Sequence, residues 1–276
     1  MSGKNILITG STGFIGRNLI ATDTKNTYIP LTRNILDLSK PFPRPLDIPG
    51  FEPELNSVDT VIHLAIPRII HQFDPITSHI LFMVNVSATQ ELLEYSHGVG
   101  ANKFIFVSTG NVNRERNPSF YTVTKKCGET IAEYYRNYMH VTILRPIYVY
   151  GVGQEPNRLI PKLIQSVKNG EPIYLNGGRY GNFISPIYID DMVSCLRGAI
   201  DFDGGVTVDV SGNEGVCLRD IAEYIGELVG KDPVFEQREE EHVTMVGDML
   251  YQQLLFKPQV SWKDGIKRVL DSLLEK

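Results

Sequence analysis

The chain has 276 residues, enough for one large domain or two small ones. Hydrophobic residues make up 42% of it and charged residues 21%, a globular composition that excludes a disordered or fibrous chain. The 27 basic and 32 acidic residues give a net charge of −5, so we expect no basic surface for nucleic acid. A small ligand in a local pocket is compatible with this charge.

The cysteines and the apolar runs bear on where the protein works. Cys127, Cys195 and Cys217 are widely spaced and odd in number, which argues against a disulfide framework and predicts a reducing compartment, the cytoplasm by default. The first residues hold only a short apolar run, too short for a signal peptide. No later run approaches the roughly 20 apolar residues of a membrane span, so we expect no membrane partner.

Short apolar runs alternate with helical patterns along the first half of the chain. Strands are predicted at 5–9, 28–31, 60–64, 103–108 and 141–144, and helices at 14–21, 85–97 and 120–138. Because each parallel strand pair needs a crossover connection, this alternation predicts an α/β fold with a doubly wound parallel sheet.

The pattern loosens after Gly151 into pieces marked by glycine and proline. Helices are predicted at 157–169, 190–200, 218–229 and 263–274, with a strand at 173–175. We expect one domain over 1–150, to which about 184–212 returns, and a smaller lobe made of 151–183 and 213–276.

A glycine-rich turn joins the first strand to the first helix. Gly10, Gly13 and Gly16 have the spacing G-x-x-G-x-x-G, which lets the backbone approach a pyrophosphate bound at the helix N-terminus. A P-loop is excluded because no Lys-Ser/Thr pair follows the last glycine. The turn predicts a dinucleotide site, with a purely structural turn as the alternative.

The end of the second strand bears on which dinucleotide binds. An acidic residue there would accept from the ribose 2′-OH of NAD, whereas an arginine would pair with the 2′-phosphate of NADP. The segment Leu31-Thr32-Arg33-Asn34 has no acid, so Thr32 and Arg33 are predicted to bind the phosphate, and NADP(H) is favoured over NAD(H). The alternative is that Arg33 is a solvated loop residue.

Tyr121 and Lys125 are four residues apart, on one face of a predicted helix. A nearby ammonium favours the phenolate of a tyrosine and so makes it a better proton-transfer group at neutral pH. Ser108 and Thr109 end the preceding strand, at the carboxyl edge where doubly wound sheets bind ligands. A hydroxyl, a tyrosine and a lysine are thus predicted to form an acid/base site.

Further motifs accompany these residues in chain order. They are ILITGSTGFIG (6–16), DTVIHLA (59–65), NVSATQELL (85–93), FIFVST (104–109), PSFYTVTK (118–125), LRPIYVYG (144–151), YIDD (188–191) and W-x-x-G-I (262–266). In this order they resemble the extended short-chain dehydrogenase/reductase family, the NAD-dependent epimerases, dehydratases and reductases of nucleotide sugars. The resemblance implies a Rossmann fold with a substrate-binding lobe.

The resemblance also implies roles for individual residues. Tyr121 would exchange a proton with the sugar oxygen, Thr109 would hydrogen-bond that oxygen, and Lys125 would hold the nicotinamide ribose. Asn85 falls on a family position near the active site, with a buried structural asparagine as the alternative. The cofactor-binding positions would be Gly10, Thr12, Gly13, Phe14, Ile15, Gly16, Asp37, Leu38, Leu64, Ala65, Pro146 and Ile147.

Two departures from the family pattern concern the ligands. The short stretch between Arg33 and Asp37 has no room for a helix and is more similar to the dehydrorhamnose reductase and fucose synthase branch. Ile184 stands where many epimerases have an arginine for the substrate diphosphate; Arg179 or Arg158 would have to replace it. Without either, the substrate is not a nucleotide sugar.

The leading hypothesis is an NAD(P)-dependent nucleotide-sugar epimerase or reductase that transfers hydride at a sugar carbonyl or hydroxyl. The alternatives are an NADPH-dependent reductase of a non-sugar ketone or aldehyde, and a non-catalytic NADP-binding sensor. The histidines have no metal-ligand spacing, so no metal site is predicted. The resemblance implies a homodimer. The helix predicted at 120–138 carries one apolar stripe, which would suit either the dimer interface or the core of the chain: Ile131, Tyr134, Tyr135 and Tyr138.

Overall fold

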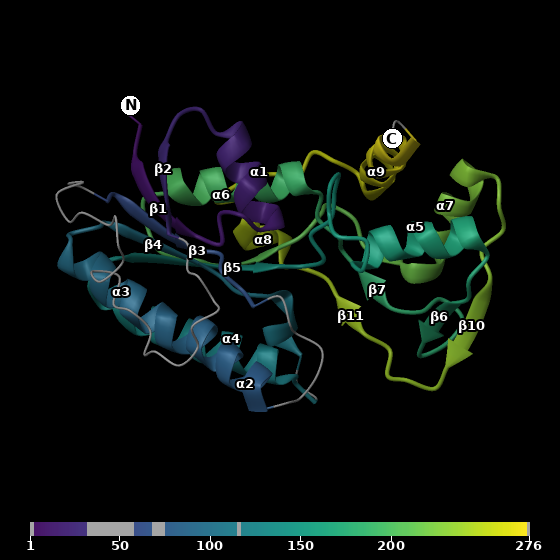
Figure 1. The fold of residues 1–276 in the computed structure, drawn as a ribbon, viewed down its shortest axis with the longest axis horizontal. Helices are drawn as coiled ribbons and strands as arrows, with labels where there is room; N and C mark the ends of the chain where they lie inside the picture. The colour runs from purple at the N-terminus through teal and green to yellow at the C-terminus, as the bar shows by residue number, and fades with distance from the viewer. Residues whose placement is uncertain (1–2, 32–57, 68–74, 115–116, 275–276) are drawn as a thin grey trace. The chain divides into compact units, whose positions relative to one another are not determined.

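The computed structural model describes residues 3–31, 58–67, 75–114 and 117–274 (Figure 1). The chain divides into two compact units. The first unit comprises Met1–Arg145 and Leu196–Val208, and the second comprises Pro146–Cys195 and Asp209–Lys276. The chain therefore leaves the first unit after Arg145, returns to it for a short segment, and leaves it again after Val208.

A six-stranded sheet organises the first unit. Its described strands stand in the order β2-β1-β3-β4-β5-β8. They are β1 (Asn5–Thr9), β2 (Thr27–Leu31), β3 (Thr60–His63), β4 (Lys103–Val107), β5 (His140–Pro146) and β8 (Thr207–Val210). The pairs from β2 to β5 are parallel, and the bond from Ile143 N to Val206 O extends the ladder to the chain entering β8.

Helices cover both faces of this sheet. Figure 1 shows α2 (Pro75–Phe82), α3 (Ala88–Gly98) and α4 (Phe120–Tyr134) on one face, and α1 (Phe14–Thr22) on the other. The end of α6 (Ile189–Asp201) also belongs to the first unit. The predicted doubly wound fold is confirmed: β3 and β4 are buried at every residue, as strands covered on both faces must be.

The helix predicted at 85–97 is part of a longer helical segment. It starts at Pro75, a residue suited to a first helical turn, and a π-helical turn, η3 (Met83–Ser87), separates α2 from α3. Residues 75–84 are apolar on most sides and have little helical periodicity, so the pattern did not reveal this part. The helix predicted at 120–138 ends at Tyr134, where a 3₁₀ turn, η5 (Tyr135–Asn137), follows.

The described residues of the second unit contain short strands, four complete helices and the start of α6. The helices are α5 (Leu159–Asn169), α7 (Leu218–Val229), α8 (Met249–Gln252) and α9 (Trp262–Leu274). The strands are β6 (Ile173–Asn176), β7 (Phe183–Ile184), β9 (Val216–Cys217), β10 (Phe235–Arg238) and β11 (Thr244–Met245). They form one pair, β10-β6, and one three-stranded sheet, β11-β7-β9. Most of them escaped prediction because runs of two to four residues show no periodicity.

No helix in the described part of the chain is long and apolar enough to cross a membrane. Cys127, Cys195 and Cys217 are all free thiols.

Candidate active site

The glycine turn leaves β1 at the carboxyl edge of the sheet. Gly10 has φ +71°, and a Cβ on it would lie 2.7 Å from the Leu64 carbonyl carbon. A Cβ on Gly16 would lie 2.4 Å from the Gly10 carbonyl oxygen. Both positions therefore require glycine, because any side chain would displace the backbone of the turn or of the neighbouring loop.

The turn presents the uncapped N-terminus of α1. Gly13 is the N-cap residue and makes no side-chain cap bond, and the first turn holds no acidic residue. The first N–H groups of a helix have no partner within the helix, and the helix dipole makes this end positive. Thr12 and Gly13 are exposed beside it, so the turn suits a phosphate group. These residues fit the pyrophosphate of a dinucleotide.

Leu64 and Ala65 lie across from this turn, at the end of β3. The Leu64 amide donates to the Thr9 carbonyl over 3.3 Å, which continues the pairing of β3 with β1 for one residue. A Cβ on Gly10 would approach the Ala65 nitrogen to 2.8 Å. The structure therefore brings these predicted wall residues against the glycine turn.

Thr109 follows β4 at the same edge. It is 9% exposed and extended, and it is the N-cap of η4 (Gly110–Asn113), where its Oγ1 accepts from the Asn111 amide over 3.3 Å. The bond uses an acceptor site of the hydroxyl and leaves its proton for another acceptor. The cap fixes the position of this hydroxyl at the edge of the sheet.

Tyr121 and Lys125 are carried by α4, which begins at the next cap. Ser119 caps this helix by accepting from the Thr122 amide over 3.2 Å. Tyr121 lies in the first turn and is half-buried, whereas Lys125 lies one turn later with no exposed surface. The spacing of four residues places both side chains on one face of the helix, as the sequence indicated.

The ammonium of Lys125 reaches the end of β4. Its Nζ donates to the Val107 carbonyl over 2.9 Å and lies 4.8 Å from the centre of the Phe106 ring. Burial lowers the pKa of Lys125 to about 7, and the charge of Glu129 opposes this shift. Val107 O is two residues before Thr109, so the structure places the ammonium beside the strand end that carries the predicted hydroxyl.

Glu129 is a buried residue that the sequence reasoning missed. It has no exposed surface, and Arg145 binds it through two bonds of 2.9 and 2.7 Å. Burial alone would raise the pKa of Glu129, but the bonds and charge of Arg145, together with Lys126, lower it below its usual value. A glutamate four residues after Lys125 was the available signal, since that spacing puts it on the same helix face.

Asn85 lies in the middle of η3 and is fully buried. Its Nδ2 donates to Thr124 Oγ1 over 3.0 Å, and that hydroxyl donates to the Tyr121 carbonyl over 3.0 Å. Its Oδ1 is buried without a hydrogen-bond partner among the described residues. Asn85 therefore supports the first turn of α4.

Several predicted site residues cannot be placed beside these groups. Thr32, Arg33, Asp37 and Leu38 lie outside the described residues. Pro146, Ile147, Arg158 and Arg179 belong to the second unit.

The candidate substrate arginines differ in their surroundings within the second unit. Arg158 Nε lies 3.8 Å from Glu155 Oε2, and Arg179 is exposed with its guanidinium 5.7 Å from the Tyr180 ring centre. Ile184 is 1% exposed, in the strand between β11 and β9, and packs in the core of that unit. The position that holds an arginine in many epimerases is thus a core position here.

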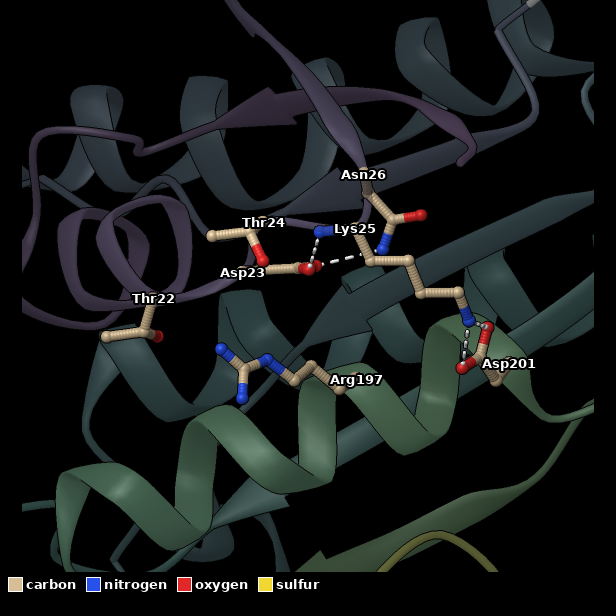
Figure 2. A pocket seen from close by; sticks show the side chains of 7 residues that line it. All are labelled: Thr22, Asp23, Thr24, Lys25, Asn26, Arg197 and Asp201. Carbon is tan, nitrogen blue, oxygen red and sulfur yellow. Dashed lines mark hydrogen bonds and ion pairs between the residues drawn. The ribbon is translucent and has the colours of Figure 1, made fainter. Parts of the chain in front are cut away.

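A separate cavity of about 270 Å³ opens at the amino edge of the sheet, between the end of α1 and the end of α6 (Figure 2). Its lining is Thr22, Asp23, Thr24, Lys25, Asn26, Arg197 and Asp201. Lys25 Nζ binds both carboxylate oxygens of Asp201, at 2.9 and 3.1 Å. Asp23 accepts from the Lys25 amide, from Asn26 and from the Tyr28 hydroxyl. The two carboxylates that line this cavity, those of Asp23 and Asp201, are therefore already bound by other groups of the protein.

A parallel sheet with a glycine turn at the end of β1, and a hydroxyl, a tyrosine and a lysine at the end of β4 on the same edge, is typical of a dinucleotide-binding enzyme of the Rossmann class. The family model described as NAD dependent epimerase/dehydratase family matches residues 6–209. The chain belongs to this family, whose members are enzymes that depend on NAD(P).

Two relatives illustrate the similarity in sequence. A protein of Bacillus subtilis (strain 168) named as the uncharacterized UDP-glucose epimerase YtcB is 28% identical over 95% of each chain. GDP-6-deoxy-D-talose 4-dehydrogenase of Aggregatibacter actinomycetemcomitans is 28% identical over 62% of each chain.

Solved structures share the fold. UDP-glucuronic acid 4-epimerase from Bacillus cereus, solved with UDP-glucuronic acid and NAD, has a TM-score of 0.79 at 23% identity, covering 98% of this chain and 99% of its own. UDP-N-acetylglucosamine 4-epimerase from Methanobrevibacter ruminantium M1, solved with UDP-N-acetylmuramic acid, has a TM-score of 0.80 at 20% identity, covering 100% and 99%.

Proposed function

We propose that this enzyme converts a nucleotide-linked sugar with a bound nicotinamide dinucleotide, using Tyr121 as the proton-transfer group. The observation that carries the proposal is that the uncapped α1 N-terminus and the Lys125 ammonium, beside the end of β4, lie at the same edge of the sheet. Relatives named as epimerases and dehydratases of UDP- and dTDP-sugars support the substrate class.

The residues divide the chemistry between them. The N–H groups of α1 and the glycine turn would hold the pyrophosphate, and the nicotinamide when bound supplies hydride transfer. Thr109 would donate its hydroxyl proton to the reacting sugar oxygen, and Tyr121 would take up or return the proton of that oxygen. The Lys125 ammonium favours the Tyr121 phenolate and holds the nicotinamide ribose. The second unit would bind the rest of the substrate.

Bound cofactor and net turnover distinguish an epimerase or dehydratase from a reductase. An enzyme that takes a hydride and returns it retains its cofactor, whereas a reductase consumes reduced cofactor. We expect the purified protein to release a dinucleotide on denaturation and to convert members of a panel of UDP-, dTDP- and GDP-sugars, followed by chromatography. A protein that binds no dinucleotide, or converts none of the panel, contradicts this proposal.

The identity of the dinucleotide remains a separate prediction. Thr32 and Arg33, with no acid beside them, favour NADP(H), whereas structural neighbours were solved with NAD. Titrating both dinucleotides against the protein decides between them. Tighter binding of NADP(H), lost in Arg33→Ala, supports the prediction, and tighter binding of NAD(H) contradicts it.

A second candidate function rests on the buried Ile184. A desolvated diphosphate needs cationic or N–H partners, and this core position supplies no charge. The second candidate is therefore a reductase of a ketone or aldehyde that carries no nucleotide. Oxidation of NADPH by simple ketones, together with no conversion of nucleotide sugars, would favour it over the first.

We propose a homodimer that uses the exposed end of α4. The predicted stripe divides in the structure: Ile131 and Tyr135 pack against the core, whereas Tyr134 and Tyr138 are 59% and 53% exposed. Two exposed aromatic side chains suit an interface between copies of this chain. Sedimentation should give twice the monomer mass, and Tyr138→Ser should lower the association constant.

A further inference from the structure

His63 ends β3 and is fully buried among groups that fix its hydrogen bonds. Its Nε2 lies 3.2 Å from the Val84 carbonyl, and its Nδ1 lies 2.6 Å from Thr9 Oγ1. A carbonyl only accepts, so Nε2 carries the proton and Nδ1 accepts from the Thr9 hydroxyl. The same hydroxyl accepts from the Ala65 amide over 3.2 Å. The hydrogen bonds run in one direction, from Ala65 through Thr9 and His63 to Val84. We call this chain of three hydrogen bonds the relay.

The two ends of this relay belong to different parts of the site. Ala65 lies in the wall against the glycine turn, where the dinucleotide is proposed to bind. Val84 lies in η3, immediately before Asn85, which supports Tyr121 through Thr124. A Cβ on Gly128 would lie 2.5 Å from Asn85 O, so α4 packs directly on the π turn. The relay therefore connects the dinucleotide wall to the helix that carries Tyr121 and Lys125.

The π turn explains why an imidazole stands at position 63. In η3 the Met83 carbonyl accepts from the Ala88 amide, five residues later, so the α-helical pairing is broken at this turn. The Val84 carbonyl, in this turn, accepts a hydrogen bond from His63 Nε2. An apolar residue at 63 would remove the hydrogen bonds that the Val84 carbonyl and the Thr9 hydroxyl make to the imidazole.

Burial and the charge of Lys125 lower the pKa of His63 to about 3. The neutral imidazole is therefore favoured in the physiological range, and its bonds to Thr9 and Val84 select one tautomer, which suits a fixed spacer.

We propose that His63 is a positioning residue, which sets the distance between the Leu64–Ala65 wall and the Tyr121 helix through the bonds to Thr9 and Val84. The proposal rests on the proposed function, because it assigns that wall to the dinucleotide. It extends the site to three residues outside the hydroxyl, tyrosine and lysine set: Thr9, His63 and Val84.

The test compares variants that break the relay with variants that keep it. Thr9→Val removes the hydroxyl and keeps the volume, whereas Thr9→Ser keeps the hydroxyl; His63→Phe removes both imidazole bonds. Ser96→Ala is the matched control, since it removes a buried hydroxyl bonded to Leu92 O in α3, away from the relay. Each variant is measured for dinucleotide Kd, kcat and melting temperature.

We expect Thr9→Val to weaken dinucleotide binding about tenfold and to lower kcat about tenfold. Thr9→Ser should restore both toward the wild-type values, and Ser96→Ala should lower the melting temperature with neither effect. His63→Phe should resemble Thr9→Val, and the double variant should lose no more than His63→Phe alone. If His63→Phe fails to fold, the two Thr9 variants still decide the question.

Three outcomes count against the proposal. Unchanged Kd and kcat in Thr9→Val, with only a lower melting temperature, would assign the relay a purely structural role. Equal losses in Thr9→Val and Thr9→Ser would show that the hydroxyl does not carry the effect. A wild-type chain that binds neither NAD(H) nor NADP(H) overturns the proposed function and this proposal with it, whereas an active wild type with unaffected variants overturns this proposal alone.

Discussion

The two edges of the parallel sheet use buried polar groups differently. At the amino edge, Lys103 is 6% exposed, and its ammonium donates to carbonyls at and just after the end of α6, those of Ala199, Ile200 and Phe202. Lys4 and Lys25 pair with Asp201 beside it. Arg197 Nε is buried without a hydrogen bond among the described residues, but the charge of Arg197 acts on Asp23 beside it.

The carboxyl edge leaves bonding capacity unused within the described protein. Lys125 makes one hydrogen bond with three donors, Asn85 Oδ1 has no partner, and α1 begins without a side-chain cap. Unpaired buried groups are destabilising, so a fold keeps them where a ligand completes the bonding. The comparison predicts that substitutions at the carboxyl edge reduce activity, whereas those at the amino edge reduce stability.

The largest effect should come from Tyr121→Phe. Removing a proton-transfer group lowers kcat by about 10²- to 10⁴-fold, while the dinucleotide affinity and the melting temperature stay close to wild type. Steady-state rates on the substrate found in the panel, with dinucleotide titration, measure this. Tyr134→Phe is the control, since Tyr134 lies on the same helix with its side chain exposed. Equal rates for the two variants would remove Tyr121 from the mechanism.

At the amino edge, Lys103→Met should destabilise the fold and leave kcat unchanged. The variant loses three bonds from an ammonium to carbonyls at the end of α6, and a bond to a charged group has a net contribution of about 1.5–3 kcal/mol. Because burial lowers the pKa of Lys103 to about 8, part of this gain is offset, and we expect a net loss of about 2 kcal/mol. Urea unfolding measures it; a loss of kcat without a loss of stability would contradict the assignment of this edge.

Lys125→Met should raise the free energy of unfolding, whereas Lys103→Met lowers it. It should also change how this free energy depends on pH. The pKa of Lys125 is about 7 in the folded protein and about 10.4 when unfolded, so between these values the unfolded chain binds more protons and wild-type stability rises with pH. From pH 7 to pH 9 this contributes about 2 kcal/mol that the variant lacks. Urea unfolding of both proteins without cofactor at the two pH values tests it, and parallel pH profiles would contradict the lowered pKa.

The sequence predicted the parts of this comparison that depend on local pattern. Gly10 and Gly16 were identified from their spacing, because a turn against a helix start needs glycine at those positions, and Tyr121 and Lys125 because four residues make a helical turn. The π turn was missed, since a period of 3.6 residues cannot show one wider turn. Lys103 was missed as well, because its partners are 96 and 97 residues away in the sequence.

The smallest effect should come from the exposed pair at the rim of the amino-edge cavity. Lys25 and Asp201 have side-chain exposures of 43% and 49%, so water and salt screen their charges. The pKa of Asp201 is lowered by its bond to Lys25 and by the charge of Lys4, and Lys4 stays beside it when Lys25 is removed. Lys25→Ala should therefore lower the free energy of unfolding by about 0–1 kcal/mol, and less in 1 M salt. A loss as large as that of Lys103→Met would mean that the rim of the cavity, and not only the buried end of α6, stabilises this edge of the sheet.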